Sequence, residues 1–137
     1  MWWVFALLSA FFAALTTILA KIGIAGVDSN LATAIRTVVI LFVAWGIFLV
    51  MGNPHDITRL TGRNLLFLGL SGITTGLSWL CYFKALQDGK ASDVAPIDKS
   101  SLVMTLILAA VILGEPLGWK TVFGGLMIIA GTVMVIL

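Results

Sequence analysis

A carboxylate and an ammonium group stand side by side at Asp98 and Lys99, inside an apolar stretch over residues 91–115. One charged side chain at the centre of a membrane helix costs roughly 2.5–3.5 kcal/mol on insertion scales. Ser101 and Thr105 follow Asp98 at spacings of three and four residues, so the three share a helical face, whereas Lys99 points about 100° away toward a neighbouring groove. Because such residues bind substrate or exchange a proton in transporters, we predict this role for Asp98, Lys99 and Ser101.

A second candidate group combines a cation with aromatic rings. Arg36 lies roughly two turns inside another apolar stretch, and its guanidinium stays charged at any accessible pH, so it needs a partner, water or a path to the headgroups. Trp79 and Tyr82 stand well inside a third stretch rather than at an interfacial belt. We predict that Arg36 holds an anionic group and that Trp79 and Tyr82 line the apolar wall. Lys21 either joins this site or snorkels to the membrane surface.

The composition determines which elements must position these residues. The chain has 137 residues, 61% hydrophobic and 10% charged, with a mean hydropathy of +1.15. A soluble domain of this length has too little interior to bury so much apolar surface. Apolar runs of about 20 residues recur, and that length crosses a hydrocarbon core of roughly 30 Å. We expect an all-α integral membrane protein, a single domain over 1–137, with spans at about 2–25, 30–51, 63–87, 91–115 and 117–137.

Local signals refine these spans. Asp28 or Ser29 can cap the second helix. Pro96 is expected near the start of the fourth helix, where its missing N–H matters least, and the turn at 114–116 should end that helix. Small residues suit close contact between helices in lipid. This applies to one face of the first span (Ala10, Ala14 and Thr17) and to the glycines of the last span (Gly124, Gly125 and Gly131).

Several classes of function are disfavoured. The basic residues form no cluster that suggests nucleic acid, and the lone thiol, Cys81, excludes an intramolecular disulfide. The first apolar run lacks a basic leading region and a convincing cleavage site, so we expect it to stay as a span. The one histidine, His55, lies in a loop, and no span carries a catalytic dyad or metal-ligand cluster. We therefore expect no enzyme, no catalytic residue, no cofactor and no metal.

The charges within the spans are distributed unevenly. When the spans are folded into hairpins, five charged residues fall on one side of the membrane: Lys21, Arg36, Lys84, Asp98 and Lys99. This suggests a wet vestibule that stops partway across, and four cations with one carboxylate give +3, which favours an anionic or zwitterionic guest. The alternative is a set of snorkelling cations with one ion pair that holds helices together. Loop charges give no clear orientation by the positive-inside rule, so the chain could insert both ways.

Two stretches resemble a known family. The pattern AL-x2-G-x-AS-x-VAPI over 85–97 and the run TLILAAVILGE over 105–115 resemble the EamA-type domain of the drug/metabolite transporter superfamily, as does the ending GTVMVIL. The segments LAKIGIAGVDSNLATAIRT and VAPIDKSSLVMTLILA read like its single-domain, five-span bacterial/archaeal branch. The chain departs from the usual pattern after VAPI, where Asp98, Lys99 and Ser100 replace apolar residues and a proline. Substrates of two-domain relatives therefore cannot be carried over.

The resemblance implies a fold and a mode of action. Typical members carry two such domains in inverted orientation, so one five-span domain is half of that fold, and a homodimer would rebuild it. An odd number of spans requires the two copies to lie antiparallel. The resemblance thus implies transport of a small metabolite or drug-like solute across the cytoplasmic membrane by alternating access. The alternative is a non-transporting membrane subunit, or half of a hetero-oligomeric transporter.

Overall fold

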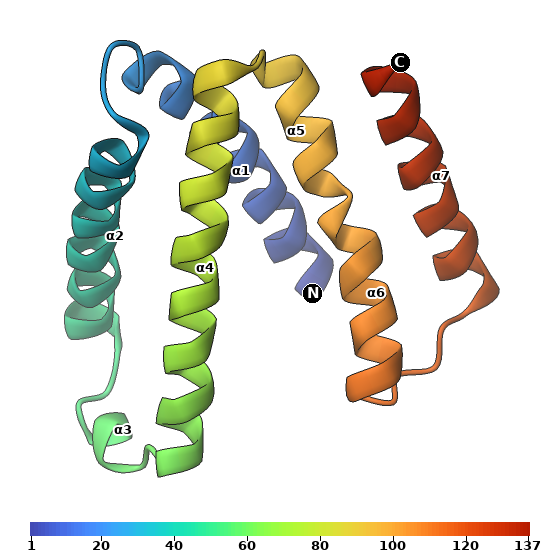
Figure 1. Ribbon diagram of the computed structural model, residues 1–137. Helices are drawn as coiled ribbons and strands as arrows, with labels where there is room; N and C mark the ends of the chain where they lie inside the picture. The colour runs from blue at the N-terminus through green and yellow to red at the C-terminus, as the bar shows by residue number, and fades with distance from the viewer. The chain divides into compact units, whose positions relative to one another are not determined.

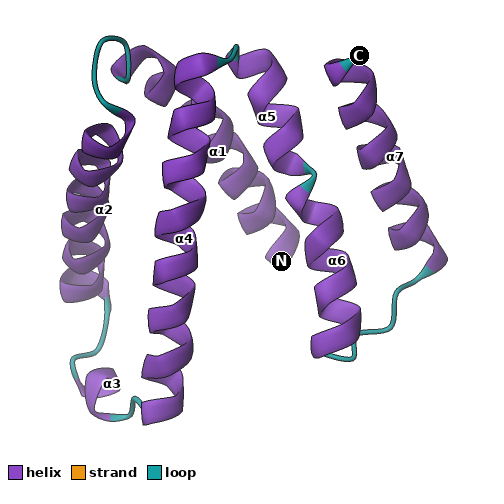
Figure 2. Cartoon of the chain, viewed as in Figure 1, coloured by secondary structure: helices purple, strands orange, loops and turns teal.

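The computed structural model describes residues 1–137, and its elements are all helices (Figures 1 and 2). In chain order they are α1 (Trp2–Gly23), α2 (Ser29–Met51), α3 (His55–Thr58), α4 (Gly62–Asp88), α5 (Ala91–Lys99), α6 (Ser101–Ile112) and α7 (Trp119–Ile136). Five segments are long and apolar enough to cross a membrane, and α5 with α6 makes up the fourth. The expected all-α membrane fold with five spans is therefore confirmed. The largest difference in a boundary is at the end of the fourth span, expected at 115 and found at 112.

The fourth span is not the continuous helix that we expected. It is interrupted at Ser100, which separates α5 from α6 (Figure 2). The Ser100 N–H donates to the Ile97 carbonyl at 3.0 Å, and the Val103 N–H donates to the Ser100 carbonyl at 3.0 Å. Both bonds reach back three residues, the spacing of a tighter 3₁₀ turn. The chain thus changes its helical geometry directly after Asp98 and Lys99.

The expected position of Pro96 was also wrong. Pro96 lies inside α5 rather than in its first turn. A proline there removes one hydrogen bond of the helix, and its ring crowds the preceding turn. The predicted end of this span is confirmed, because Gly114 adopts a φ of +67° just after α6, a conformation that favours glycine.

The helices divide into two compact units, and the first comprises Leu19–Gln87. Asp28 caps α2, because its Oδ1 accepts from the N–H groups of Asn30 at 2.9 Å and Leu31 at 3.1 Å. Two side chains hold the end of α1 and the loop after it against the end of α4. The Lys21 ammonium donates to the Leu86 carbonyl, and Gln87 Nε2 donates to the Val27 carbonyl at 2.7 Å. We call these two bonds the loop clasp.

The second unit comprises Met1–Ile18 and Asp88–Leu137. In it α7 lies along both α5 and α6 (Figure 1). A Cβ on Gly125 would lie 3.3 Å from Leu106 Cδ1, so the helices approach closely at this glycine. Gly124 and Gly131 have nothing within 4 Å of such a Cβ. The expectation that this helix packs closely against another is confirmed at Gly125, whereas Gly124 and Gly131 have no close neighbour within this chain.

Candidate functional site

The Leu19–Gln87 unit places Arg36 of α2 against the aromatic face of α4. The guanidinium carbon lies 3.4 Å from the centroid of the Trp79 ring and 5.9 Å from that of Phe83. Trp79 meets Tyr82 nearly edge to face, with centroids 5.4 Å apart and an interplanar angle of 84°. Phe83 lies 5.7 Å from Trp79 at 57°. The structure thus brings together Arg36, Trp79 and Tyr82, which sequence analysis placed in one group.

Helical spacing explains how α4 presents these rings. Residues 79, 82 and 83 stand three and four positions apart, so they occupy one face over about one turn. Phe83 is buried, with an exposed fraction of 3%, and Leu86 on the same face is fully buried. These apolar anchors fix the register of α4 in its unit, and the Trp79 ring is thereby held beneath the guanidinium. A cation over a ring face at this distance is attracted by the ring quadrupole.

A cavity of about 250 Å³ opens beside the guanidinium. Small and aliphatic side chains make up most of its wall, which consists of Ala20, Gly23, Ile24, Val27, Ala32, Ile35, Arg36 and Phe83. Arg36 is the charged residue among them. We call this cavity the arginine pocket. Because the guanidinium is held by ring faces, the N–H groups at its edge can serve a ligand with acceptor oxygens.

Lys21 has a different place in the same unit. Its ammonium donates to the Leu86 carbonyl in the last turn of α4, where carbonyl groups lack partners within the helix. A cation is also favoured at this end by the helix dipole. Lys21 does not line the arginine pocket. Its position supports a structural role in the loop clasp, and its role in a site stays a prediction.

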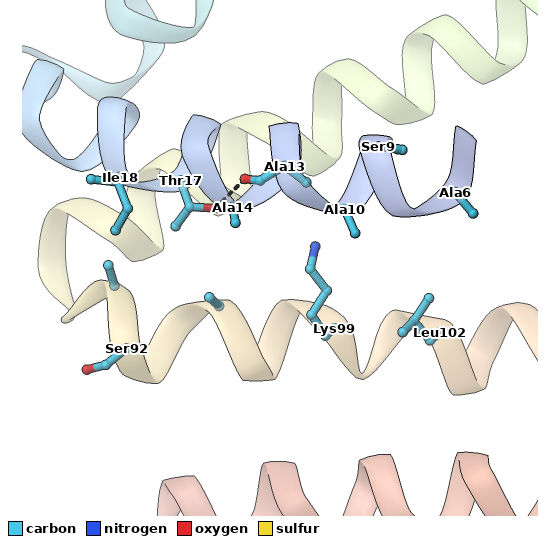
Figure 3. Close-up of a pocket in the computed structure, with 12 residues that line it drawn as sticks. Ala6, Ser9, Ala10, Ala13, Ala14, Thr17, Ile18, Ser92, Lys99 and Leu102 are labelled. Atoms are coloured by element: carbon cyan, nitrogen blue, oxygen red, sulfur yellow. Dashed lines mark hydrogen bonds between the residues drawn. The ribbon is translucent and has the colours of Figure 1, made fainter. Parts of the chain in front are cut away.

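The other unit contains Asp98 and Lys99 at the end of α5. Lys99 Nζ lies 3.1 Å from Asp98 Oδ2, and the side chains are 55% and 33% exposed. A cavity of about 630 Å³ lies between the first helix and the α5–α6 span, and we call it the lysine pocket. In Figure 3 the Lys99 side chain extends from α5 toward Ala10 and Ala14 of α1. The prediction that Lys99 turns toward a groove is therefore consistent with the structure.

The walls of the lysine pocket are mostly small and apolar. From α1 they include Ala6, Ser9, Ala10, Ala13, Ala14, Thr17 and Ile18, and from the fourth span Ala91, Ser92, Ala95, Lys99 and Leu102. The small-residue face of α1, which we expected to contact another helix, instead leaves this space open. One ammonium group in an apolar cavity can orient a ligand by its charge.

Ser101 stands apart from the lysine pocket. It is the first residue of α6, it is exposed, and its carbonyl accepts from the Thr105 hydroxyl at 3.0 Å. It does not line the cavity. The structure thus groups Arg36, Trp79, Tyr82 and Lys21 in one unit and Asp98, Lys99 and Ser101 in the other. No group of histidine, cysteine and carboxylate side chains is arranged to hold a metal ion.

Sequence analysis missed two polar residues that shape these units. Gln87 completes the loop clasp, and Thr132 of α7 donates its hydroxyl to the Pro96 carbonyl at 3.2 Å. Thr132 had a usable signal, because an isolated hydroxyl on the small-residue face of a membrane helix often bonds across to a neighbour. Gln87 had none, since a polar residue at the end of a span is ordinary.

Comparison with known proteins agrees with the geometry. Five helices long and apolar enough to cross a membrane, with charged groups beside two cavities, are typical of a multi-pass membrane transporter. The model of the EamA-like transporter family matches residues 1–137. The chain is 48% identical over 133 residues to an uncharacterized transporter in the cobO 3′ region of Sinorhizobium sp, covering 97% of this chain and 94% of that protein. No solved structure matches. The chain belongs to the EamA-like transporter family, which also supports the expectation that it is not an enzyme.

Proposed function

We propose that the protein carries a small anionic or zwitterionic metabolite across the cytoplasmic membrane, as an antiparallel homodimer that works by alternating access. The observation that carries this proposal is the Arg36 guanidinium, which lies on the Trp79 ring beside an apolar cavity. A cation inside a membrane span costs free energy, and here aromatic rings rather than a carboxylate stabilise it. Because the rings carry no net charge, the positive charge of Arg36 is available to an anionic substrate.

The chemistry of the arginine pocket favours a carboxylate. A guanidinium presents paired N–H donors that match two carboxylate oxygens, and stacking on Trp79 fixes the plane of this fork. The remaining walls are apolar, and Tyr82 supports the Trp79 ring. The volume of about 250 Å³ lies below the roughly 300–1,000 Å³ of clefts for drug-sized ligands. The pocket suits a short carboxylate with a small apolar tail.

The lysine pocket supplies the proposed coupling step. With Asp98 ionised, the Asp98–Lys99 pair has no net charge. A substrate anion that binds Lys99 competes with Asp98, and a proton on Asp98 keeps the loaded site neutral, which a low-dielectric environment favours. Anion and proton would thus bind together. Lys21 and Ser101 keep their predicted role in binding substrate or a proton, although neither lines the arginine pocket or the lysine pocket.

The antiparallel dimer follows from the single five-span domain. The chain supplies one such domain, and an odd number of spans sends two facing copies in opposite directions if they are to form an inverted repeat. The weak charge bias of the loops permits both orientations. Rocking of one copy against the other would then expose the pockets to each side in turn.

Cysteine labelling tests the assembly. In a Cys81→Ser background, His55→Cys and Leu137→Cys place single thiols at two points separated by three spans. An impermeant thiol reagent applied to intact cells should label both variants, each to partial extent. Labelling of one variant alone would show a single orientation and exclude the antiparallel dimer. Co-purification of a second membrane protein in fixed ratio would then favour the non-transporting subunit.

Ligand binding tests the substrate class. Short carboxylates and amino acids, assayed singly against the purified protein, should raise the melting temperature, whereas their amides should not. Arg36→Gln should abolish this rise, and Arg59→Gln, in an exposed segment, serves as the control. Equal stabilisation by acids and amides would contradict the proposed anionic substrate.

A further inference from the structure

Thr132 makes an unusual contact with the interrupted span. Its side chain belongs to α7, its exposed fraction is 8%, and its hydroxyl donates to the Pro96 carbonyl of α5 at 3.2 Å. In an unbroken α-helix the Pro96 carbonyl would accept from the N–H of Ser100, four residues later. Here the Ser100 N–H turns to Ile97 instead. The Thr132 hydroxyl thus takes the place of a backbone donor.

Because Thr132 of α7 is the donor to the Pro96 carbonyl, α7 stabilises the interruption of the fourth span. A carbonyl group inside a membrane span needs a hydrogen-bond donor from the protein, because the hydrocarbon chains of the lipid supply none. If Thr132 did not supply one, the nearest donor would be the Ser100 N–H, and that bond would continue α5 through Ser100. The Thr132 bond removes this advantage of the continuous helix. The Ser100 hydroxyl adds to the effect, since it donates to the Ile97 carbonyl at 2.7 Å.

A second contact lets α7 hold both halves of the span. Gly125 is buried, and its surroundings are Leu106 and Val103 of α6. Gly125 and Thr132 are seven residues apart, so they lie on nearly the same face of α7, two turns from each other. The glycine contacts the half after the interruption and the threonine the half before it. The helix α7 therefore contacts the fourth span on both sides of Ser100.

We propose that Thr132 is a positioning residue that keeps the fourth span interrupted and thereby directs the Lys99 ammonium into the lysine pocket. A 3₁₀ turn advances by about 120° per residue and an α-helix by about 100°, so conversion of one residue turns its neighbours by about 20°. Loss of the Thr132 hydroxyl would therefore swing Lys99 relative to the pocket wall. The effect of this rotation on transport depends on the proposed role of Lys99. The hydrogen bond of Thr132 and the interruption of the span do not depend on it.

Carbonyl NMR tests the hydrogen bond directly. The chain has three prolines, Pro54, Pro96 and Pro116, so protein labelled with carbonyl-¹³C proline gives three signals in lipid bilayers. Thr132→Val, which replaces the hydroxyl by a methyl of similar size, should shift the Pro96 signal and leave the other two in place. Thr132→Ser keeps the donor and should retain the original shift. If Thr132→Val disturbs folding, Thr132→Ala removes the same donor with less steric change. An unchanged Pro96 signal in a folded variant would overturn the proposal.

A charge-sensitive reaction tests the position of Lys99. Leu102 also lines the lysine pocket, so Leu102→Cys in the Cys81→Ser background places a thiol near the ammonium. The rate ratio of an anionic to a cationic methanethiosulfonate reagent reports the local potential. Thr132→Val should change this ratio about threefold or more, and Thr132→Ser should leave it unchanged. A shifted Pro96 signal with a constant ratio would overturn the positioning role. If the cysteine-labelling experiment showed a single orientation, the antiparallel dimer would be excluded. The role proposed here for Thr132 would not be affected.

Discussion

Two regions of this transporter keep a cation inside a membrane span, and they do so by different means. Arg36 lies on the ring of Trp79 at 3.4 Å, whereas Lys99 is paired with the carboxylate of its own neighbour, Asp98, at 3.1 Å. The rings carry no net charge, so the arginine region stays positive. The Asp98 carboxylate offsets the Lys99 charge, so the lysine region carries no net charge.

Under the proposed function, this difference gives the two cations distinct roles. A guanidinium on an aromatic support can hold an anion in a fixed orientation. The Lys99 ammonium already has a carboxylate partner, so an anionic substrate must compete with Asp98 for it. Phe83 and Leu86, on the helix face that supports Arg36, are buried, whereas Lys99 lies in an open cavity.

Trp79→Ala should give the largest effect. It removes the face on which Arg36 lies, an edge contact with Tyr82 and a tilted ring contact with Phe83. We expect the free energy of unfolding, measured by SDS titration in mixed micelles, to fall by roughly 3 kcal/mol. Trp45→Ala is the matched control, because Trp45 has one edge contact, with Phe48 at 5.8 Å. Its loss should be about 1 kcal/mol, and equal losses would argue against a special role for the cation.

Double-mutant cycles measure the coupling free energy of both pairs, Arg36 with Trp79 and Lys99 with Asp98. The cycle of Arg36→Met with Trp79→Leu should give a coupling free energy of about 1–2 kcal/mol. The cycle of Lys99→Met with Asp98→Asn should give less than about 1 kcal/mol, because the Asp98 and Lys99 side chains are 33% and 55% exposed and their attraction is screened. The reverse order of the two coupling free energies would contradict the distinction between a cation held by aromatic rings and one paired with an exposed carboxylate.

Asp98→Asn sharpens the comparison at the lysine pocket. Without the carboxylate the Lys99 charge is uncompensated, so the ratio of anionic to cationic reagent rates at Leu102→Cys should rise about threefold. A ratio in Asp98→Asn equal to that of the parent protein would show that the Asp98 carboxylate does not screen the Lys99 charge.

The loop clasp should give the smallest effect. Gln87→Leu removes the bond to the Val27 carbonyl at 2.7 Å and should lower the free energy of unfolding by about 0.5–1.5 kcal/mol. Lys120→Met, an exposed residue in the other unit, is the control and should have little effect. A clasp variant as stable as this control would show that the bond contributes nothing measurable.

The fold was largely predictable from the sequence, and the local geometry was not. Lipid requires each span to satisfy its own backbone, so apolar length alone located the five spans. The stacking of Arg36 on Trp79 was foreseen only as membership of one group, since helical periodicity gives the face of a residue but not its partner. The break at Ser100 was missed, because it depends on Thr132, which is 32 residues further along. The hydroxyl of Thr132 signals a contact with some neighbouring helix, but nothing in the sequence around Ser100 shows that the contact falls there.

The loop clasp also bears on the order of events during synthesis. Its two bonds join residues 65 and 60 positions apart in the chain. Neither can form until the third hydrophobic segment has emerged from the ribosome, by which time the first two have been offered to the translocation machinery. The clasp therefore cannot guide which way the first hairpin enters the bilayer. It forms only after the orientation of the first hairpin has been set.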